Sequence, residues 1–313
     1  MQLLEWSKLS QKMQQDLTQK TSKLFWNKNG EDKYVWIIYL WNDKSSKVYV
    51  WLKQKYGEKI GLAVHIFGQY KKGDNLPDNT SNDYDVQLYM KQEYDSIWKI
   101  IDLINYLNSD KDCVWIIVQL PLPEKFQEYK AKILSTIAPN KDIDGMWWIL
   151  TWLASIDLID FVPATPKAVI KILDEYNLGN LKWQTVSIIW QSNLVGKPLV
   201  MECIKRWATV YTCNKQTPID NIKNMTKQSD IIISCTWVVH LINSDFIRND
   251  NSQTIIDVWY WHKNWKPVWD VDFDSVQDKV NYITPVPGGI WPLTVACLFD
   301  NIFTIQESLG EIL

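Results

Sequence analysis

The stretch VSIIWQSNLVGKP (residues 186–198) joins a short apolar run to a polar turn and then to the start of a helix. A buried strand that leads through a turn into a helix is the ligand-binding unit of open parallel α/β sheets, where phosphate groups meet the helix N-terminus. The turn holds a single glycine, Gly196, and no GxGxxG pattern. It therefore predicts an α/β fold, while a nucleotide site and an ordinary strand–helix connection are about equally consistent with it.

The alternation of strand and helix continues on the C-terminal side of this turn. Residues 163–179 predict a helix with prolines at its start and Gly179 near its C-cap. Three apolar runs predict further strands at 208–212, 230–235 and 254–258. Short strands separated by helices in this way are typical of a Rossmann-type dinucleotide domain.

The N-terminal half shows the same alternation. Helical spacing predicts helices over 7–25, 46–57 and 97–107, and apolar runs predict strands over 34–40, 62–67 and 114–120. Strands that alternate with helices form parallel βαβ units. We therefore expect an N-terminal α/β catalytic domain over residues 1–160 and a Rossmann-type domain over residues 161–287, with residues 288–313 packing back on the first domain.

Composition and charge exclude several classes of protein. The net charge is −3, the pI is about 5.7 and no basic run occurs, which argues against a nucleic-acid partner. No apolar stretch reaches the roughly 18 residues of a membrane helix, and the polar N-terminus lacks a signal peptide's apolar core, so we expect a cytoplasmic chain with no membrane partner. The five cysteines form no CxxC pair and the three histidines, His65, His240 and His262, lie far apart, so we expect neither a metal site nor a disulfide framework.

Two further segments, KDIDG (residues 141–145) and ITPVPGG (residues 283–289), form a highly specific combination. With them the chain resembles, over nearly its whole length, the bifunctional methylenetetrahydrofolate dehydrogenase/cyclohydrolase family of one-carbon metabolism. The resemblance implies oxidation of 5,10-methylenetetrahydrofolate with NADP, or with NAD, and then hydrolysis of the methenyl product to 10-formyltetrahydrofolate. It also implies a cytoplasmic homodimer whose product supplies purine biosynthesis.

The resemblance places the folate site in the N-terminal domain. Tyr49 and Lys53 lie one helical turn apart, a spacing more often found on plain helix surface, but here it matches the family's Ser-x-x-Tyr-x-x-x-Lys motif. The resemblance implies that Tyr49 lines the folate ring and that Lys53 moves protons. It implies that Gln119 of VQLPLP tunes Lys53 and that Asp144 anchors the pterin through paired hydrogen bonds. Further substrate contacts are implied for Leu120, Pro121, Pro287, Gly288 and Gly289.

The turn after residue 189 resembles the family's GRSxxVGxP turn, which holds the dinucleotide, with Trp190 at the glycine and Gln191 at the arginine. The family arginine helps to bind the 2′-phosphate of NADP, so Gln191 leaves the choice between NADP and NAD open. Lys215 in the next loop is either a replacement cation, which would bind phosphate as a point charge, or a solvated loop lysine. The implied cofactor contacts are Trp190, Gln191, Ser192, Lys215 and Tyr260.

The tryptophans are abnormal in number and in place. The chain has 19 Trp and only 11 Gly in 313 residues, so glycine has about half of its usual share of about 7%. In the hairpin-like piece around Asn264 and Trp265, tryptophan stands where a tight turn needs a positive φ, which is strained for such a residue. Many tryptophans fall where the family pattern carries or favours glycine: Trp6, Trp41, Trp115, Trp152, Trp183, Trp190, Trp207, Trp237, Trp259, Trp265, Trp269 and Trp291.

We therefore hypothesise that the gene reads UGA as glycine, so that these tryptophans are glycines in the natural protein. A protein with tryptophan at positions 190, 237 and 259 is expected to bind the cofactor weakly or not at all, because the indoles would crowd the dinucleotide cleft.

Two other functions stay open. One is a dehydrogenase with little cyclohydrolase activity, against which Tyr49, Lys53 and Gln119 argue. The other is a non-catalytic module that uses exposed tryptophans as stacking platforms.

Overall fold

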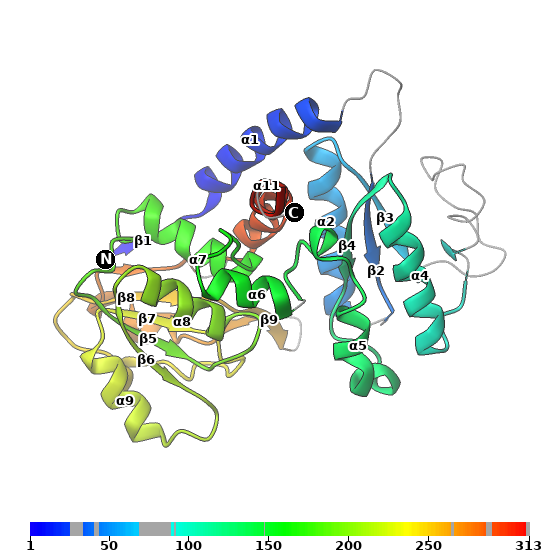
Figure 1. The fold of residues 1–313 in the computed structure, drawn as a ribbon. Helices are drawn as coiled ribbons and strands as arrows, with labels where there is room; N and C mark the ends of the chain where they lie inside the picture. The colour runs from blue at the N-terminus through cyan, green and yellow to red at the C-terminus, as the bar shows by residue number, and fades with distance from the viewer. Residues whose placement is uncertain are drawn as a thin grey trace. The chain divides into compact units, whose positions relative to one another are not determined.

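The computed structural model describes residues 1–25, 34–40, 44–68, 89–90, 92–146, 148–263, 266–285 and 290–310. The chain divides into two compact units, whose elements are labelled in Figure 1. Unit 1 comprises Met1–Lys12 and Val162–Leu298, and unit 2 comprises Met13–Phe161 and Phe299–Leu313. Each unit contains a parallel sheet with helices, so the predicted α/β class is confirmed.

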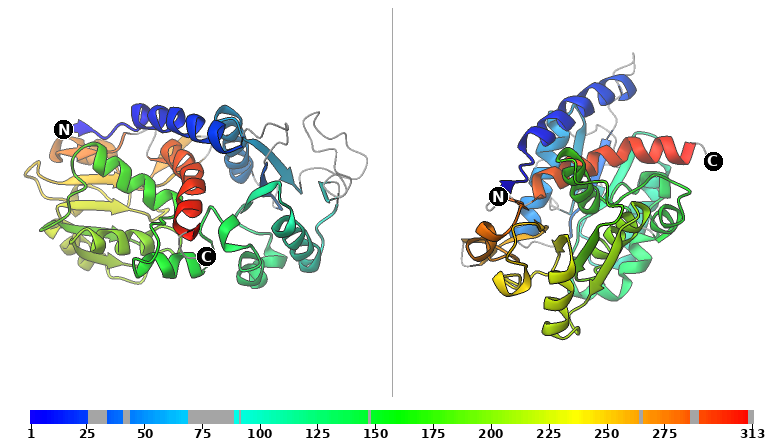
Figure 2. Two further views of the ribbon diagram at one scale, coloured as in Figure 1. Left: turned by 45° about the horizontal axis from the view of Figure 1, so that its top comes forward. Right: turned by 90° about the vertical axis from the view of Figure 1, so that its left-hand side faces the viewer.

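Unit 1 is built on a six-stranded sheet in which all neighbouring strands are parallel (Figure 2). In spatial order the strands are β1 (Gln2–Leu3), β11 (Tyr282–Ile283), β8 (Thr254–Asp257), β7 (Ile231–Ser234), β5 (Thr185–Ile189) and β6 (Thr209–Cys213). The strands predicted from apolar runs are confirmed. The chain runs from β5 to β6 on one side and returns to β7 on the other. The sheet therefore has a topological switch point between β5 and β7.

Three helices accompany these strands. In chain order, α7 (Ala164–Glu175) precedes β5, α8 (Gly196–Lys205) joins β5 to β6, and α9 (Ile219–Gln228) joins β6 to β7. Helix α8 packs on both β5 and β6, so its N-terminus begins at the edge where β5 ends. The shorter helical turns of the unit are η3 (Ser244–Phe246), α10 (Phe273–Val276) and η4 (Gln277–Lys279).

Helix α7 ends earlier than the sequence predicts. Its last residue is Glu175, and Asn177 takes the left-handed conformation, with a φ of 58°, that turns the chain. Asparagine tolerates this conformation better than most residues do. The prediction that Gly179 forms the C-cap is therefore wrong, because Asn177 already ends the helix.

An antiparallel pair of strands, β9 (Tyr260–Lys263) and β10 (Lys266–Trp269), follows β8. This is the hairpin that the sequence predicts, with Lys263 paired to Lys266. The turn residues Asn264 and Trp265 lie outside the described residues, so the predicted strain at Trp265 stays a prediction.

Unit 2 has a three-stranded parallel sheet in the order β3 (Ala63–Phe67), β2 (Tyr34–Ile38) and β4 (Cys113–Val118). Its helical segments are α2 (Lys44–Lys59), α4 (Ile97–Ser109), η1 (Glu124–Tyr129), α5 (Lys130–Leu134), η2 (Pro139–Lys141) and α6 (Trp148–Ser155). The first and last of the three unit boundaries fall inside α1 (Ser7–Phe25) and α11 (Trp291–Gly310), and the second falls between α6 and α7. Among the described helices, none has the length and apolar character that crossing a bilayer takes.

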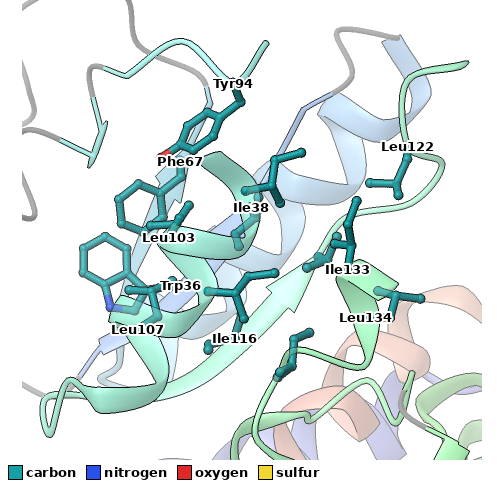
Figure 3. Packing of buried hydrophobic residues seen from close by; sticks show 14 of the residues in the cluster. Trp36, Ile38, Phe67, Tyr94, Leu103, Leu107, Ile116, Leu122, Ile133 and Leu134 are labelled. Carbon is teal, nitrogen blue, oxygen red and sulfur yellow. The ribbon is translucent and has the colours of Figure 1, made fainter. Parts of the chain in front are cut away.

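A buried apolar cluster holds α4 against this sheet (Figure 3). The helix contributes Ile100, Leu103, Ile104 and Leu107, which recur at helical spacing and are all completely buried. Buried side chains of all three strands join the same cluster, among them Trp36, Ile38, Phe67, Ile116 and Val118. The core thereby fixes β4, and with it the residues that follow the end of this strand.

Candidate active site

Lys53 and Asp144 meet in unit 2. Lys53 lies on α2, and its Nζ is 3.4 Å from Oδ2 of Asp144, which lies in the turn after η2. Only 12% and 15% of the two side chains are exposed, so the ion pair is screened less than a surface pair would be. Tyr49 lies one turn before Lys53 on the same helix and is half-buried. The structure thus brings together two predicted site residues that are 91 positions apart in the sequence.

The backbone of the turn that carries Asp144 is held by two contacts. Gly145 has a φ of 65°, and a Cβ at this position would lie 2.3 Å from the ring of Phe161, so glycine is required here. Nδ2 of Asn301, on α11, donates a hydrogen bond of 3.2 Å to the carbonyl oxygen of Ile143. The position of the carboxylate therefore depends on a glycine and on the last helix.

Gln119 follows β4, and its backbone N–H donates to the carbonyl oxygen of Ile38 at 2.9 Å. Its Nε2 donates to the carbonyl oxygen of Leu120 at 2.8 Å, whereas Oε1 is buried and has no hydrogen-bond partner among the described residues. A buried acceptor without a partner costs free energy, so Oε1 is suited to a donor brought by a ligand or a water molecule. Within the described part of the chain, no hydrogen bond joins Gln119 to Lys53.

Some predicted contacts cannot be placed. Pro287, Gly288 and Gly289 lie outside the described residues, and so does the side chain of Tyr260.

The other two predicted substrate contacts, Leu120 and Pro121, follow Gln119 and are joined by a cis peptide bond. Over the described stretches, no group of His, Cys, Asp and Glu side chains is arranged to hold a metal ion.

In unit 1, the turn between β5 and α8 has the backbone of a phosphate-binding turn. Position 190 has a left-handed φ of 77°, and a Cβ on Gly196 would lie 2.1 Å from the carbonyl oxygen of Trp190. Ser192 Oγ accepts a hydrogen bond from Gly196 N at 3.3 Å, and Val195 at the N-cap supplies no side-chain cap. The tight turn therefore presents the start of α8, where backbone N–H groups favour an anion.

The side chains at this edge of the sheet do not fit a dinucleotide. Trp190, Trp237 and Trp259 follow the C-terminal ends of β5, β7 and β8, which is where open parallel sheets bind ligands. The ring centroids of Trp237 and Trp259 are 4.0 Å apart. Trp259 Nε1 is buried and has no hydrogen-bond partner in the described part of the chain. The adjacent rings of Trp237 and Trp259 thus stand at the strand ends where the cofactor of such a domain is expected. The half-buried side chain of Trp190 lies in the turn at the same strand ends and also packs against the core of unit 1.

The remaining predicted cofactor residues lie at neighbouring strand ends. Strands β5 and β6 pair in parallel with Ile189 opposite Cys213, so Gln191 and Lys215 each lie two residues beyond paired positions. Lys215 is exposed, and Ser192 lies on the turn itself. This register is compatible with both residues facing the same end of a dinucleotide.

Asp257 and Asp270 form a buried acidic pair outside the set of predicted site residues. They are 0% and 2% exposed. Asp257 Oδ2 accepts a hydrogen bond from Val271 N at 2.8 Å, and Asp270 Oδ2 accepts one from Ser234 Oγ at 3.0 Å. Burial raises the pKa of both carboxyl groups, and the charge of Asp270 raises the pKa of Asp257 further. An aspartate at the end of a buried strand, as in IIDV, is the signal that points to Asp257.

Two family models match the two halves of the chain. The model of the tetrahydrofolate dehydrogenase/cyclohydrolase catalytic domain matches residues 4–144, and the model of its NAD(P)-binding domain matches residues 163–309. The chain belongs to this family. The bifunctional protein FolD of Thermodesulfovibrio yellowstonii is 35% identical over 246 residues, which make up 77% of this chain and 84% of that protein. FolD of Mesoplasma florum is 42% identical over 213 residues, or 67% and 71% of the two chains.

Solved structures of tetrahydrofolate dehydrogenase/cyclohydrolases share the fold. The FolD enzyme of Campylobacter jejuni has a TM-score of 0.82 at 30% identity, with 99% of each chain covered. The FolD enzyme of Trypanosoma brucei, solved with NADP and an inhibitor, has a TM-score of 0.81 at 25% identity, with 99% of this chain and 98% of that chain covered. The chain is therefore an enzyme of the methylenetetrahydrofolate dehydrogenase and methenyltetrahydrofolate cyclohydrolase type, and its C-terminal half is an NAD(P)-binding domain.

Proposed function

We propose that residues 1–160 bind the folate and residues 161–287 bind the dinucleotide, with Lys53 as the catalytic proton-transfer residue of hydrolysis. The observation that carries this proposal is the contact of 3.4 Å between Lys53 Nζ and Asp144 Oδ2 in a mostly buried setting. A carboxylate can accept paired hydrogen bonds from the amino and ring N–H groups of a pterin. Asp144 thus anchors the ring system, Tyr49 lines it, and Lys53 is held beside the bound folate.

Hydrolysis of the methenyl group consumes one water molecule, of which one proton ends on N5 and the other is released. Water attacks the carbon between N5 and N10, and Lys53, acting as the neutral amine, takes one proton from it. Lys53 then gives this proton to N5 as the bond between N5 and the carbon breaks, which leaves 10-formyltetrahydrofolate and releases the second proton of the water. The buried Oε1 of Gln119 accepts a hydrogen bond from the attacking water or from Lys53. No metal ion is required for these steps.

Substitution of Lys53 tests this assignment. Lys53→Met keeps the length of the side chain but removes the amine, and we expect kcat for methenyl hydrolysis to fall by about 10²–10⁴-fold. Asp144→Asn is expected mainly to raise KM, because it weakens the pterin anchor. Both are measured by the loss of methenyltetrahydrofolate absorbance. A Lys53→Met enzyme with normal kcat would contradict the assignment. A parent enzyme without any hydrolysis would favour the alternative of a dehydrogenase with little cyclohydrolase activity.

For the cofactor we propose NADP, with NAD as the alternative. The support is the register of β5 and β6, which places Gln191 and Lys215 at adjacent strand ends, where an ammonium can meet a 2′-phosphate as a point charge. In a chain with glycine at positions 190, 237 and 259, we expect Lys215→Met to weaken NADP binding by about tenfold and to leave NAD binding unchanged. Equal effects on the two dinucleotides would show that Lys215 is a solvated loop residue. Ser192 and Tyr260 are proposed as further contacts.

The assembly and cellular setting are proposed on the likeness to FolD proteins alone. We propose a cytoplasmic homodimer that supplies one-carbon units to purine biosynthesis. The chain has a mass of 36.9 kDa, so light scattering on the purified protein separates a monomer from a dimer. A monomeric mass at working concentration would contradict this proposal.

We also propose that many tryptophans of this sequence are glycines encoded by UGA in the natural protein. The support is the composition, because 19 Trp stand beside only 11 Gly. Mass spectrometry of peptides from the native protein tests this directly. Glycine masses at positions 190 and 265 are expected, and tryptophan at both positions would refute the proposal.

A further inference from the structure

The residues other than glycine that have a positive φ fall into two groups. One group is of the types that tolerate the left-handed conformation; it consists of Asp157, Asn177, His240 and Asn251. The other group within the described part of the chain is entirely tryptophan, at Trp183 (φ 70°), Trp190 (77°), Trp207 (66°) and Trp237 (62°). In this conformation Cβ crowds the following carbonyl oxygen. A bulky side chain such as that of tryptophan does nothing to relieve this backbone strain.

The C-terminal end of α8 shows what this backbone needs. Hydrogen bonds from the N–H groups of Trp207 and Ala208 close the helix as a Schellman motif, with Trp207 at the left-handed position. The same two bonds close α2, α6 and α7, where this position is held by Gly61, Asp157 and Asn177. Glycine is the usual residue there. Trp207 is 80% exposed, so little packing offsets the strained backbone.

The four tryptophans lie near the two opposite ends of the strands in the unit 1 sheet. Trp183 and Trp207 precede β5 and β6, at the N-terminal ends of parallel strands, and are 86% and 80% exposed. Trp190 follows β5 and Trp237 follows β7, at the C-terminal ends. They therefore flank the topological switch point between β5 and β7, which is where ligands of such sheets bind.

We infer that positions 183, 190, 207 and 237 are glycine positions of the dinucleotide domain, and that positions 190 and 237 control the access of the dinucleotide to the switch point. The inference rests on the proposed binding of the dinucleotide by residues 161–287. Glycine at 190 and 237 relieves the backbone and removes two indoles from the ligand edge. Glycine at 183 and 207 relieves the backbone alone. The two pairs of positions thus separate an effect on stability from an effect on binding.

Thermal unfolding of the full-length chain tests the expected effect of glycine at positions 183 and 207 on stability. Trp183→Gly and Trp207→Gly are each expected to raise the melting temperature by about 2 °C. Trp51→Gly is the matched control, because Trp51 is 53% exposed in the middle of α2, where glycine disfavours the helix and lowers the melting temperature. If Trp183→Gly and Trp207→Gly lower the melting temperature as Trp51→Gly does, these are not glycine positions.

Calorimetric titration with NADP and NAD tests the binding half. The double variant Trp183→Gly/Trp207→Gly is expected to bind no better than the parent. The triple variant Trp190→Gly/Trp237→Gly/Trp259→Gly, which also removes the partner of the Trp237 ring, is expected to bind with a Kd on the order of micromolar to millimolar. If the parent is insoluble, the comparison starts from a chain with glycine at all these positions. Tryptophan returned to position 190 is then expected to abolish binding, and tryptophan returned to position 183 is not.

Methenyl hydrolysis needs no dinucleotide and is measured on the same proteins. A triple variant that hydrolyses the substrate but binds neither dinucleotide would overturn this inference and leave the hydrolytic function standing. A triple variant that binds a dinucleotide but does not hydrolyse the substrate would overturn the proposed role of unit 2 and leave this inference standing.

Discussion

Gly145 follows Asp144 in the chain and faces the ring of Phe161. Its φ is 65°, and a Cβ would lie 2.3 Å from a ring carbon, closer than real side chains approach. Gly61 has a similar φ of 82°, but a Cβ there would have no neighbour nearer than an oxygen of Thr21 at 4.0 Å. Comparing the two glycines therefore separates backbone strain from steric collision next to the site.

We expect Gly145→Ala to destabilise the protein by roughly 2–4 kcal/mol, since a collision is added to the strain of the left-handed backbone. Hydrolysis is expected to fall as well, because the displaced turn carries Asp144. Gly61→Ala has the backbone strain alone and should cost about 1 kcal/mol with normal hydrolysis. Urea denaturation and the hydrolysis assay measure both effects. Equal losses in the two variants would show that the Phe161 contact has no role.

The pairing of Lys53 with Asp144 marks the limit of what residue spacing can predict. The placement of Tyr49 and Lys53 on one helix follows from local spacing. The nearness of Asp144, 91 residues later, was expected only through the resemblance to a known family. The unpartnered Oε1 of Gln119 could not be predicted at all, since hydrogen bonding of a buried side chain depends on tertiary packing.

Elements were predictable where their burial is strong and uniform. Strand β7 is completely buried and reads as a continuous apolar run. Helix α9 was missed because it is mostly polar and buries only Ile222 and Thr226. Strands β1 and β11 have two residues each, too few to show a periodicity, and their pairing with the rest of the sheet is a tertiary property. Strands as short as these could not be predicted from the sequence alone.

The buried pair Asp257 and Asp270 joins the end of β8 to the segment after β10, and it predicts a pH dependence. Both folded-state pKa values are raised above the usual 3.8. The folded state holds the protons of these carboxyl groups more tightly than the unfolded state does. Their contribution to stability is therefore fully present below pH 3.8 and is lost as the pH rises through the raised pKa. Asp270→Asn removes one of the two groups and the charge that raises the pKa of Asp257.

The Asp270→Asn variant should therefore lose less unfolding free energy than the parent when the pH rises from about 4 to about 7. Its amide oxygen can still accept the hydrogen bond from Ser234. Urea denaturation across this range measures the difference, and Asp278→Asn, an exposed site, serves as the control. A difference between variant and parent that stays constant with pH would mean that the pair does not titrate in this range.

At the scale of the whole chain, each terminus belongs to the unit that is remote from it in sequence. Met1–Lys12 supplies β1 beside β11 in unit 1, and Phe299–Leu313 belongs to unit 2. Phe299 is completely buried, and its ring stacks on Tyr56 at a centroid distance of 5.5 Å. Asn301 bonds to the carbonyl oxygen of Ile143, next to Asp144. The second half of α11 thus supports both the core of unit 2 and the turn of its site.

A chain that ends after Leu298 should consequently lose methenyl hydrolysis. The truncation removes Phe299, and loss of one such buried aromatic side chain alone costs about 3–5 kcal/mol. Hydrogen exchange should show loss of protection in β2–β4 of unit 2, while β5–β8 of unit 1 stay protected because none of their residues is removed.

Two further variants serve as controls. A chain that ends after Gly310 keeps all of α11 and should hydrolyse normally. Asn301→Ala in the full chain removes the hydrogen bond to the carbonyl oxygen of Ile143, worth about 1 kcal/mol, and should lower hydrolysis without unfolding unit 2. Normal hydrolysis by the chain that ends after Leu298 would show that α11 is dispensable for the site.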